Sequence, residues 1–461
     1  MDLHEKCGVI GIYSNQNDIA RSVYYGLWSL QHRGQENSGI ASSNGKKFFF
    51  HKGKGLVSHV YAEKDLDKLK GNIAIGHNRY STFGKTDIDH SQPVCNHNDT
   101  IALAHNGNLP LVSKLKKFLT DHGIAYSGLN DSEMMFKTVE YHFVKTRNIA
   151  ESLKQSFELF TGAFSLVVMT KKDLVGVRDS NGIRPLCIGK FVGGYVLASE
   201  SCALDTIGAE FVRDVEPGEM IVINENGLTS FQLGIPNLKF DVFEFIYFAR
   251  PDSRFMGKSV YEVRKRLGEQ LALESKIKAD VVIPVPDSSI PSAVGFSNVS
   301  KIPFEMALTK NRYIHRTFIK PAQKNRMSSV KMKLNITPEL ITGKDIIIID
   351  DSIVRGTTSK RLADLLRTAN PKSIHFFISS PPVIYPDFYG IDTPDQSELI
   401  SSKMNNVALA NYIGVDSVQL LSYSGMIDAI GLPESQLCTS CFSGIYPIGI
   451  GSKIKKLKLF V

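Results

Sequence analysis

The chain has 461 residues, of which 43% are hydrophobic and 22% are charged. This composition excludes a disordered protein, and the length favours two or more domains over one core. The longest apolar runs, such as 163–169 and 346–349, are far shorter than the roughly 18 residues of a membrane helix. The opening MDLHEKCGVIGIY contains acidic residues and no long apolar region, unlike a secretory signal. We therefore expect a cytoplasmic protein.

The net charge narrows the class of ligand, and the cysteine content bears on how the fold is stabilised. The net charge of +8 comes from 54 basic and 46 acidic residues, most of them interspersed, so nucleic acid is not the expected partner. A basic balance also suits a protein that handles phosphorylated metabolites, because a positive field attracts anions. Six cysteines are too few for a disulfide scaffold in a chain of this length.

The first half is rich in short strand-like runs separated by Gly, Asn and Asp turns. They are CGVIGIY, IAIGH, IALAHNG, FSLVVMT, YVLASE and EMIVINENG, and a helical pattern covers 132–144. This mixture predicts two antiparallel sheets with helices on their outer faces.

The pattern of apolar and polar residues changes after about residue 235. The runs VVIPVPDSS and DIIIIDDSIVRGTT are continuously apolar and end in polar residues, and a helical pattern over 358–367 follows the second. Runs of this kind predict a parallel α/β sheet whose ligands bind beyond the carboxyl ends of the strands. The segment GLTSFQLGIPNLKF, 227–240, is the best boundary. We expect a propeptide at 1–6, one domain at 7–235 and a second at 236–461.

Cys7 opens the first strand-like run and is preceded by six residues. A lone cysteine at such a place is commonly a small buried hydrophobe. If residues 1–6 are removed, Cys7 becomes the N-terminus, and its own α-amino group can take the thiol proton near neutral pH. One residue would then supply both nucleophile and base.

Four later motifs favour the second interpretation. They are LQHRGQENSG (30–39), GHNRYSTFG (76–84), AHNGNL (104–109) and NDSE (130–133). With Cys7 they resemble the glutaminase domain of class II, N-terminal-nucleophile amidotransferases, an αββα sandwich. The resemblance implies that Arg79 binds the glutamine α-carboxylate and Asp131 its α-ammonium, and that the Asn106 side chain and the Gly107 N–H form an oxyanion hole. Taken singly, AHNGNL could be an ordinary turn and Arg79 a surface ion pair.

The stretch IIIIDDSIVRGTT, 346–358, resembles the phosphoribosyl-diphosphate motif of type I phosphoribosyltransferases. An acidic pair capping a buried strand would be the plainer interpretation. The resemblance implies that Asp350 and Asp351 hold the ribose hydroxyls and one Mg²⁺ per subunit, together with Ser288 of VPDSS. The loop of Ser352, Arg355, Gly356, Thr357 and Thr358 would surround the 5-phosphate at a helix N-terminus. A basic stretch with Arg312, Tyr313, Arg316 and Lys333 suits a lid over a polyanion.

Together, the halves resemble the family of glutamine-dependent phosphoribosyl amidotransferases. The resemblance implies that glutamine-derived ammonia displaces diphosphate from phosphoribosyl diphosphate, the first committed step of purine synthesis. It also implies a homo-oligomer, commonly a tetramer, inhibited by purine nucleotides. Two alternatives stay open: an aminosugar synthase, which would need a sugar-isomerase second half, and a regulatory protein that binds nucleotide or RNA on a phosphoribosyltransferase fold.

The sequence departs from the family pattern at two places. One branch of the family binds a four-iron–four-sulfur cluster through four cysteines, and here Cys438 and Cys441 remain while Asp241 and Asp387 stand at the other two positions. Such clusters prefer thiolates, so we do not expect one, and mixed Cys/Asp ligation of zinc is weaker still. His315 also stands where the family commonly has glycine, which could reshape the lid.

Overall fold

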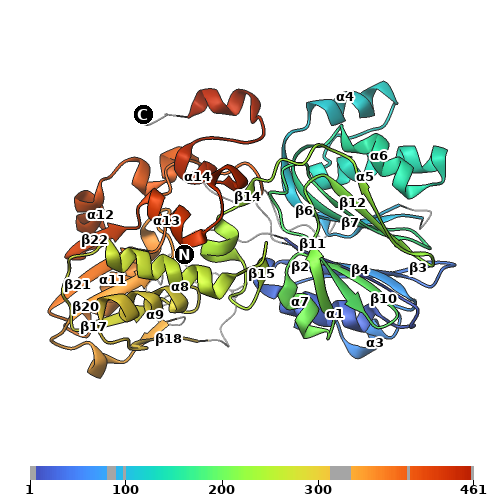
Figure 1. Cartoon of the computed structure of the whole chain (residues 1–461). Coiled ribbons are helices and arrows are strands. Elements are labelled where there is room, and N and C mark those ends of the chain that lie inside the picture. Colours follow the sequence, from blue (N-terminus) through green and yellow to red (C-terminus); the bar gives the residue numbers. More distant parts are fainter. Residues whose placement is uncertain (1–6, 80–89, 97–99, 312–333, 392–394, 458–461) are drawn as a thin grey trace.

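The computed structural model describes residues 7–79, 90–96, 100–311, 334–391 and 395–457. Within these ranges, no helix combines the length and the apolarity needed to span a membrane. The first and second halves of the chain lie side by side (Figure 1), with the first half in blue to green and the second in yellow to red.

Two antiparallel sheets face each other in the first half. The first contains, in spatial order, β11 (Glu210–Asp214), β9 (Cys187–Phe191), β10 (Gly194–Ala198), β1 (Gly8–Ser14), β4 (Ile73–Arg79), β2 (Asn37–Ser43) and β3 (Phe48–Lys54). The second contains β13 (Gly227–Gln232), β12 (Glu219–Asn224), β8 (Leu174–Arg178), β7 (Thr161–Met169), β6 (Ala102–Leu111) and β5 (Val94–Cys95). One apolar cluster, with Val9, Ile75, Ala104 and Val167 among its members, joins their inner faces.

Helices cover the outer faces of this sandwich. Those beside the first sheet are α1 (Ala20–Ser29), η1 (Gln31–Arg33), α2 (Val57–Val60), α3 (Glu63–Leu66) and α7 (Ser201–Thr206). Those beside the second are α4 (Ser113–Asp121), α5 (Asp131–Thr146) and α6 (Ile149–Phe157). The start of α5 is fixed by a reciprocal cap, in which Glu133 N–H donates to Asn130 Oδ1 over 2.9 Å and Asn130 N–H to Glu133 Oε2 over 2.8 Å. The predicted αββα sandwich is confirmed.

The second half is built on a four-stranded parallel sheet. Its order is β17 (Val281–Pro284), β20 (Asp345–Asp350), β21 (Ser373–Ile378) and β22 (Ser417–Leu420). Side chains of β20 alternate between two cores: Ile347 and Ile349 face one, and Ile346 and Ile348 face the other. Burial on both faces explains why this run is continuously apolar, and the predicted parallel sheet is confirmed.

Helices and short strands complete this half. The helices are α8 (Val260–Leu273), α9 (Ile290–Ser300), α11 (Thr357–Arg367), α12 (Asn406–Ile413), α13 (Tyr423–Ile430) and α14 (Ser440–Ser443), with the π-helical turn η3 (Glu244–Phe248) and the 3₁₀ turns η5 (Pro338–Leu340), η6 (Gln396–Glu398), η7 (Ile400–Ser402), η8 (Glu434–Gln436) and η9 (Gly451–Lys456). The strand pairs are β14 (Phe240–Asp241) with β23 (Leu437–Cys438), β15 (Arg254–Phe255) with β16 (Lys258–Ser259), and β18 (Leu308–Lys310) with β19 (Leu334–Ile336).

The expected boundary at 227–240 is only in part a connection. Its first residues form β13, which pairs with β12 along its whole length. Residues 233–239 then run without helix or strand to β14. The connection is therefore limited to residues 233–239, because residues 227–232 form the edge strand of the second sheet.

Candidate functional site

Cys7 lies immediately before β1, at one end of the first sheet. Gly8 pairs with Asn78 of β4, so the last residue of β4, Arg79, lies one position beyond this pair and beside Cys7. Cys7 is half-buried. Its backbone carbonyl accepts a hydrogen bond of 3.2 Å from Nε of Arg33. The sheet register thus brings two of the predicted residues together.

Asn106 and Gly107 lie in β6, on the facing sheet. Asn106 is 1% exposed, and within the described part of the chain neither Nδ2 nor Oδ1 of its amide has a hydrogen-bond partner. Gly107 has φ of +149°, and an added Cβ would lie 2.0 Å from the carbonyl oxygen of Ala163 on β7. Glycine is therefore obligatory at this position. A buried amide that no protein group uses is a donor available to a ligand.

Asp131 is the first residue of α5, close to the same strand. Its Oδ2 accepts from the N–H of Leu109 over 3.1 Å, and its Oδ1 accepts from the N–H of Ser132 over 2.8 Å. Arg79 donates from Nη1 to the carbonyl of His90 over 2.7 Å. These contacts hold one carboxylate and one guanidinium at the edge of the sandwich.

Two buried histidines connect the sheets at this point. Nε2 of His77, on β4, lies 3.1 Å from the carbonyl of His105, on β6, so His77 donates from Nε2. Burial, with a smaller contribution from the nearby charge of Arg79, lowers the pKa of His77 to about 3. Burial also lowers the pKa of His105. Both imidazoles are neutral at pH 7, and their contact joins the strand of Arg79 to that of Asn106.

A second group of predicted residues meets at the carboxyl ends of β17 and β20. Oγ of Ser288 donates to Oδ2 of Asp351 over 2.6 Å, and Oγ of Ser352 donates to Oδ1 of Asp351 over 2.7 Å. The two polar clusters therefore face one crevice, as the parallel sheet predicts. Asp350 accepts from the N–H of Asp351 over 3.0 Å.

The loop after these carboxylates leads into α11. Gly356 has φ of +71° and is followed by Thr357 and Thr358, which open the helix. Backbone N–H groups at such a helix start suit a phosphate. The side chain of Arg355 is held by Glu398, with Nε 2.9 Å from Oε2.

Ionisation of both adjacent carboxylates, Asp350 and Asp351, is unfavourable without a nearby cation. Burial and the neighbouring charge of Asp351 raise the pKa of Asp350 to about 7, and burial raises the pKa of Asp351. Mg²⁺ is commonly held by one or two carboxylates together with substrate phosphates, so this oxygen donor set fits the ion.

A cavity of about 230 Å³ lies where the two halves meet. Its walls are His32 from the first half, and Tyr247, Phe248, Ala249, Arg250, Pro251, Arg264, Asp287, Ser288 and Lys310 from the second. The carboxyl-terminal edge of the parallel sheet thus opens toward the first half of the chain.

Some predicted residues lie outside the described ranges. They are the six residues of the expected propeptide and the lid residues Arg312, Tyr313, Arg316 and Lys333, with His315 among them.

The four positions that correspond to cluster ligands in one branch of the family are buried and make other contacts. Asp241 is paired with Arg184, with Oδ2 and Nη1 2.9 Å apart. Asp387 Oδ1 accepts from the N–H groups of residues 389 and 391 over 2.7 and 2.8 Å. Burial raises the pKa of Cys438 to about 12 and that of Cys441 well above its usual value. Among the described residues, no three His, Cys, Asp or Glu side chains are arranged to hold a metal ion.

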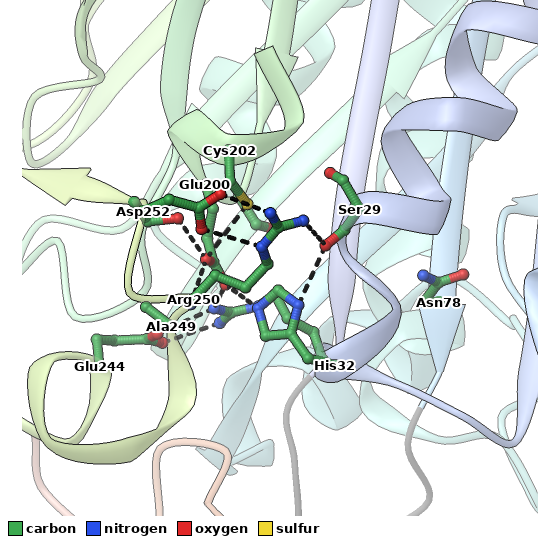
Figure 2. A network of polar contacts seen from close by, with 12 residues as sticks. Ser29, His32, Asn78, Glu200, Cys202, Glu244, Ala249, Arg250 and Asp252 are labelled. Atoms are coloured by element: carbon green, nitrogen blue, oxygen red, sulfur yellow. Dashed lines mark hydrogen bonds and ion pairs between the residues drawn. The ribbon is translucent and has the colours of Figure 1, made fainter. Parts of the chain in front are cut away.

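A buried ion-pair network between the halves was not predicted. Arg33 contacts both Glu200 and Glu244, and His32 contacts Glu200. Figure 2 shows His32, Glu200 and Arg250 converging here, with Glu244 beside them. Arg33 belongs to a motif quoted above, but nothing in the sequence near Glu244 marks it as a partner, because the pair spans 211 positions.

Comparisons with known proteins agree with both halves. A model of the glutamine amidotransferase domain matches residues 77–206, and a model of the phosphoribosyl transferase domain matches residues 257–380. Curated amidophosphoribosyltransferases from Synechocystis sp. and Bacillus subtilis are 45% and 42% identical to the chain; they cover 99% and 97% of it, and the chain covers 94% and 95% of them.

Solved structures are similar along the same length. One is the glutamine phosphoribosylpyrophosphate amidotransferase from B. subtilis complexed with ADP and GMP, with 42% identity, a TM-score of 0.89 and coverage of 96% of this chain and 98% of that one. Another, described as the allosteric regulatory enzyme of purine biosynthesis, has 41% identity, a TM-score of 0.91 and coverage of 98% and 99%. The chain therefore belongs to the amidophosphoribosyltransferase family, the glutamine-dependent transferases that catalyse the first step of purine biosynthesis.

Proposed function

We propose that Cys7 attacks the side-chain amide of glutamine and forms a glutamyl thioester with release of ammonia. The observation that carries this proposal is the buried amide of Asn106 beside Gly107, which has no hydrogen-bond partner among the residues that the structure describes. Its Nδ2 and the Gly107 N–H would stabilise the oxyanion, and the proton of the thiol passes to the α-amino group of Cys7 once residues 1–6 are removed. Water then attacks the thioester and frees glutamate.

Arg79 and Asp131 hold the rest of the glutamine molecule. A guanidinium offers two parallel donors to the α-carboxylate, and a carboxylate receives the α-ammonium. Their positions beside Cys7 and close to β6 support these roles. Bound this way, glutamine presents its amide carbon to the sulfur.

The second half, which we take as 236–461, binds phosphoribosyl diphosphate. Asp350 and Asp351 hold the ribose hydroxyls, and the turn from Ser352 through Arg355 and Gly356 to Thr357 and Thr358 holds the 5-phosphate. Ser288 and the two aspartates would hold one Mg²⁺ per subunit, and Arg312, Tyr313, Arg316 and Lys333 would form the lid. When bound, Mg²⁺ neutralises charge on the departing diphosphate.

The two domains act in sequence on one nitrogen atom. Ammonia made in the glutaminase domain, 7–235, passes internally to C1 of the sugar, and diphosphate leaves. The cavity between His32 and Ser288 supports this route, because it adjoins both halves. Shielding from water keeps the ammonia from being protonated in bulk solvent.

We further propose a cytoplasmic homo-oligomer, commonly a tetramer in this family, that is inhibited by purine nucleotides. Support for nucleotide ligands comes from the related B. subtilis enzyme, whose structure contains ADP and GMP. A nucleotide 5-phosphate presents the same group to α11 as the substrate does.

An iron–sulfur cluster does not suit this chain. Clusters need thiolates, whereas Asp241 and Asp387 stand at two of the four positions, and Asp241 is already paired with Arg184. Iron and sulfide analysis of protein purified without oxygen tests this: stoichiometric iron would contradict it.

Replacing Cys7 separates the two proposed activities. Cys7→Ala should abolish glutamine-dependent synthesis and leave synthesis from free ammonia. Asp350→Asn, the reciprocal variant, should lose synthesis from both nitrogen sources and keep glutamine hydrolysis. Simultaneous loss of every activity in a folded Cys7→Ala protein would contradict the proposed division of labour.

A further inference from the structure

Glu244 lies between two arginines of the glutaminase half. It is the first residue of η3 and is fully buried. Its Oε1 and Oε2 accept from Nη2 and Nη1 of Arg33, each over 2.9 Å, and Nη1 of Arg184 lies 3.3 Å from Oε1. A side chain of the phosphoribosyl half thus supplies the counter-charge for two arginines of the other half.

The first arginine reaches the nucleophile. Nε of Arg33 donates to the carbonyl oxygen of Cys7 over 3.2 Å, and its Nη1 also pairs with Glu200 over 2.5 Å. The guanidinium is planar, so a shift of the carboxylate on one side rotates the donor on the other. The position of Glu244 therefore bears on the backbone that presents the Cys7 sulfur.

The second arginine reaches the oxyanion strand. Nε of Arg184 donates to the carbonyl of Tyr389 over 2.8 Å. The neighbouring Phe388 carbonyl accepts from Asn108 Nδ2 over 2.8 Å, and a Cβ built at Gly390 would lie 3.3 Å from the carbonyl carbon of Gly107. This loop of the second half is packed directly against β6.

A third arginine connects the turn η3 to the phosphoribosyl-diphosphate side. Arg264 of α8 is 1% exposed and donates from Nε to the Phe245 carbonyl over 2.7 Å and from Nη2 to the Ala249 carbonyl over 2.8 Å. Arg264 lines the cavity between the halves together with Ser288. Burial lowers the pKa of Arg264 to about 10, and the nearby charge of Asp351 opposes this shift. The Arg264 carbonyl also accepts from Oγ of Ser292, near the start of α9, over 2.9 Å.

We propose that Glu244 is a positioning residue that couples the phosphoribosyl-diphosphate site to the glutaminase site. Binding of the magnesium–diphosphate group changes the charge that faces Arg264. Arg264 then shifts the turn η3 through its hydrogen bonds to the Phe245 and Ala249 carbonyls. Because Glu244 belongs to η3, its carboxylate moves relative to Arg33 and Arg184. The result is a nucleophile and an oxyanion strand that are better aligned when the acceptor sugar is present than when it is absent. This inference rests on the proposed function.

The negative charge of Glu244 is essential to the proposed coupling. A carboxylate balances two buried guanidinium groups, whereas a neutral amide of the same shape leaves part of that charge uncompensated. Glu200 and Asp241 still pair with Arg33 and Arg184 in such a variant, so the fold should survive. A linkage of this kind typically changes binding affinity by about 5–150-fold.

The test compares Glu244→Gln with Glu219→Gln. Glu219 is also buried and forms a bidentate pair with Arg213, but the pair lies within the first half. Glutamine hydrolysis is measured without and with phosphoribosyl diphosphate and Mg²⁺, and synthesis is measured with free ammonia. In Glu244→Gln the stimulation ratio should fall by about fivefold or more, with ammonia-dependent kcat and KM unchanged. Glu219→Gln should keep the wild-type ratio, and Glu244→Asp should restore part of it.

Three outcomes would overturn the coupling role: an unchanged ratio in Glu244→Gln, an equal fall in Glu219→Gln, or loss of the ammonia-dependent reaction together with the ratio. If Glu244→Gln does not fold, Arg264→Lys keeps the charge but reaches only one carbonyl, and it should show the same loss of stimulation. Failure of the proposed function looks different: wild-type hydrolysis that ignores phosphoribosyl diphosphate, or survives Cys7→Ala, would contradict that function itself.

Discussion

The buried side-chain amide of Asn106 lowers the stability of the protein when no ligand is bound. A buried polar group without a hydrogen bond costs about 1–3 kcal/mol, and both amide atoms of Asn106 are in this condition within the described part of the chain. Such a cost persists where the ligand or the transition state provides the missing partner. The neighbouring Gly107 adds an N–H at a position where no side chain fits.

Asn106→Ala should therefore affect only the glutamine reaction. We expect glutamine-dependent kcat to fall by about 10²–10³-fold, the usual effect of removing one oxyanion-hole donor. Ammonia-dependent synthesis should be unchanged, and thermal stability should not fall through lost hydrogen bonds, because the Asn106 amide forms none with the residues that the structure describes. Full activity with glutamine would rule out the assigned role.

His77 makes the glutaminase half sensitive to acid. Its pKa in the folded protein is lowered to about 3, whereas the unfolded chain binds a proton near pH 6.5. Between these values the unfolded state binds more protons, so the contribution to stability is fully present above pH 6.5 and is lost as the pH falls toward 3.

From pH 6.5 to pH 5, this one residue should cost about 2 kcal/mol of unfolding free energy. Denaturant unfolding at both pH values measures the change, and His77→Gln, which keeps a donor, should reduce it by about that amount. His59→Gln, on an exposed turn of α2, is the control. Equal pH slopes in wild type and His77→Gln would contradict this explanation.

Sequence reasoning at this scale could predict only residues that lie inside compact motifs. Cys7, Asn106 and the Asp350–Asp351 pair were predicted from their neighbours along the chain. The ion pair of Arg33 with Glu244 does not, because its partners are 211 positions apart and each is an ordinary charged residue in its own segment. Only the folded structure brings such groups together.

At the scale of elements, the pattern of apolar residues along the sequence made the strands predictable, because it reflects which faces are buried. The run over β20 is apolar at every position because both of its faces are covered, and the strand-like runs of the first half became strands of the sandwich. The boundary was predicted within 227–240, and residues 227–232 of this segment pair fully with β12. The side chains of β13 are half-buried or exposed, so this edge strand carries only a weak apolar signal.

Helices α8 and α9 meet through glycines, which the sequence did not reveal. A Cβ built at Gly268 would lie 1.8 Å from the carbonyl oxygen of Ser292. Gly268→Ala should force the helices apart and cost at least about 1–3 kcal/mol, the usual range for overpacking. Unfolding in denaturant measures this loss. Gly449→Ala, where the nearest atom is 3.9 Å away, should have little effect, and equal effects would contradict the packing argument.

The turn before α11 depends on a second glycine. Gly356 has φ of +71°, and a side chain there would approach Cδ1 of Ile400 to 2.9 Å. An L-residue in this conformation costs about 1–2 kcal/mol, so Gly356→Ala should distort the phosphate loop. We expect KM for phosphoribosyl diphosphate to rise by about 5–30-fold, while glutamine hydrolysis without the sugar stays at the wild-type rate. An unchanged KM would remove this loop from the proposed site.

At the scale of the whole molecule, one polypeptide joins two chemistries that are each simple. The glutaminase sandwich makes a reactive small molecule, and the parallel sheet holds the acceptor that consumes it. Their boundary contains the buried charges of Arg33, Arg184 and Glu244. It also contains an apolar cluster, with Ala163 and Ile183 from the first half and Tyr389, Cys438 and Ile450 from the second. Buried charges at a boundary suit domains that must sense each other, because charge interactions respond to a bound polyanion.

The mature N-terminus tests this account most directly. Intact-mass measurement of enzyme that is fully active with glutamine should give a chain that has lost residues 1–6 and begins at Cys7, because the mechanism needs the α-amino group beside the sulfur. Blocking removal of these residues should abolish glutamine use and spare the reaction with free ammonia. A fully glutamine-active enzyme whose mass still includes Met1 would contradict the mechanism.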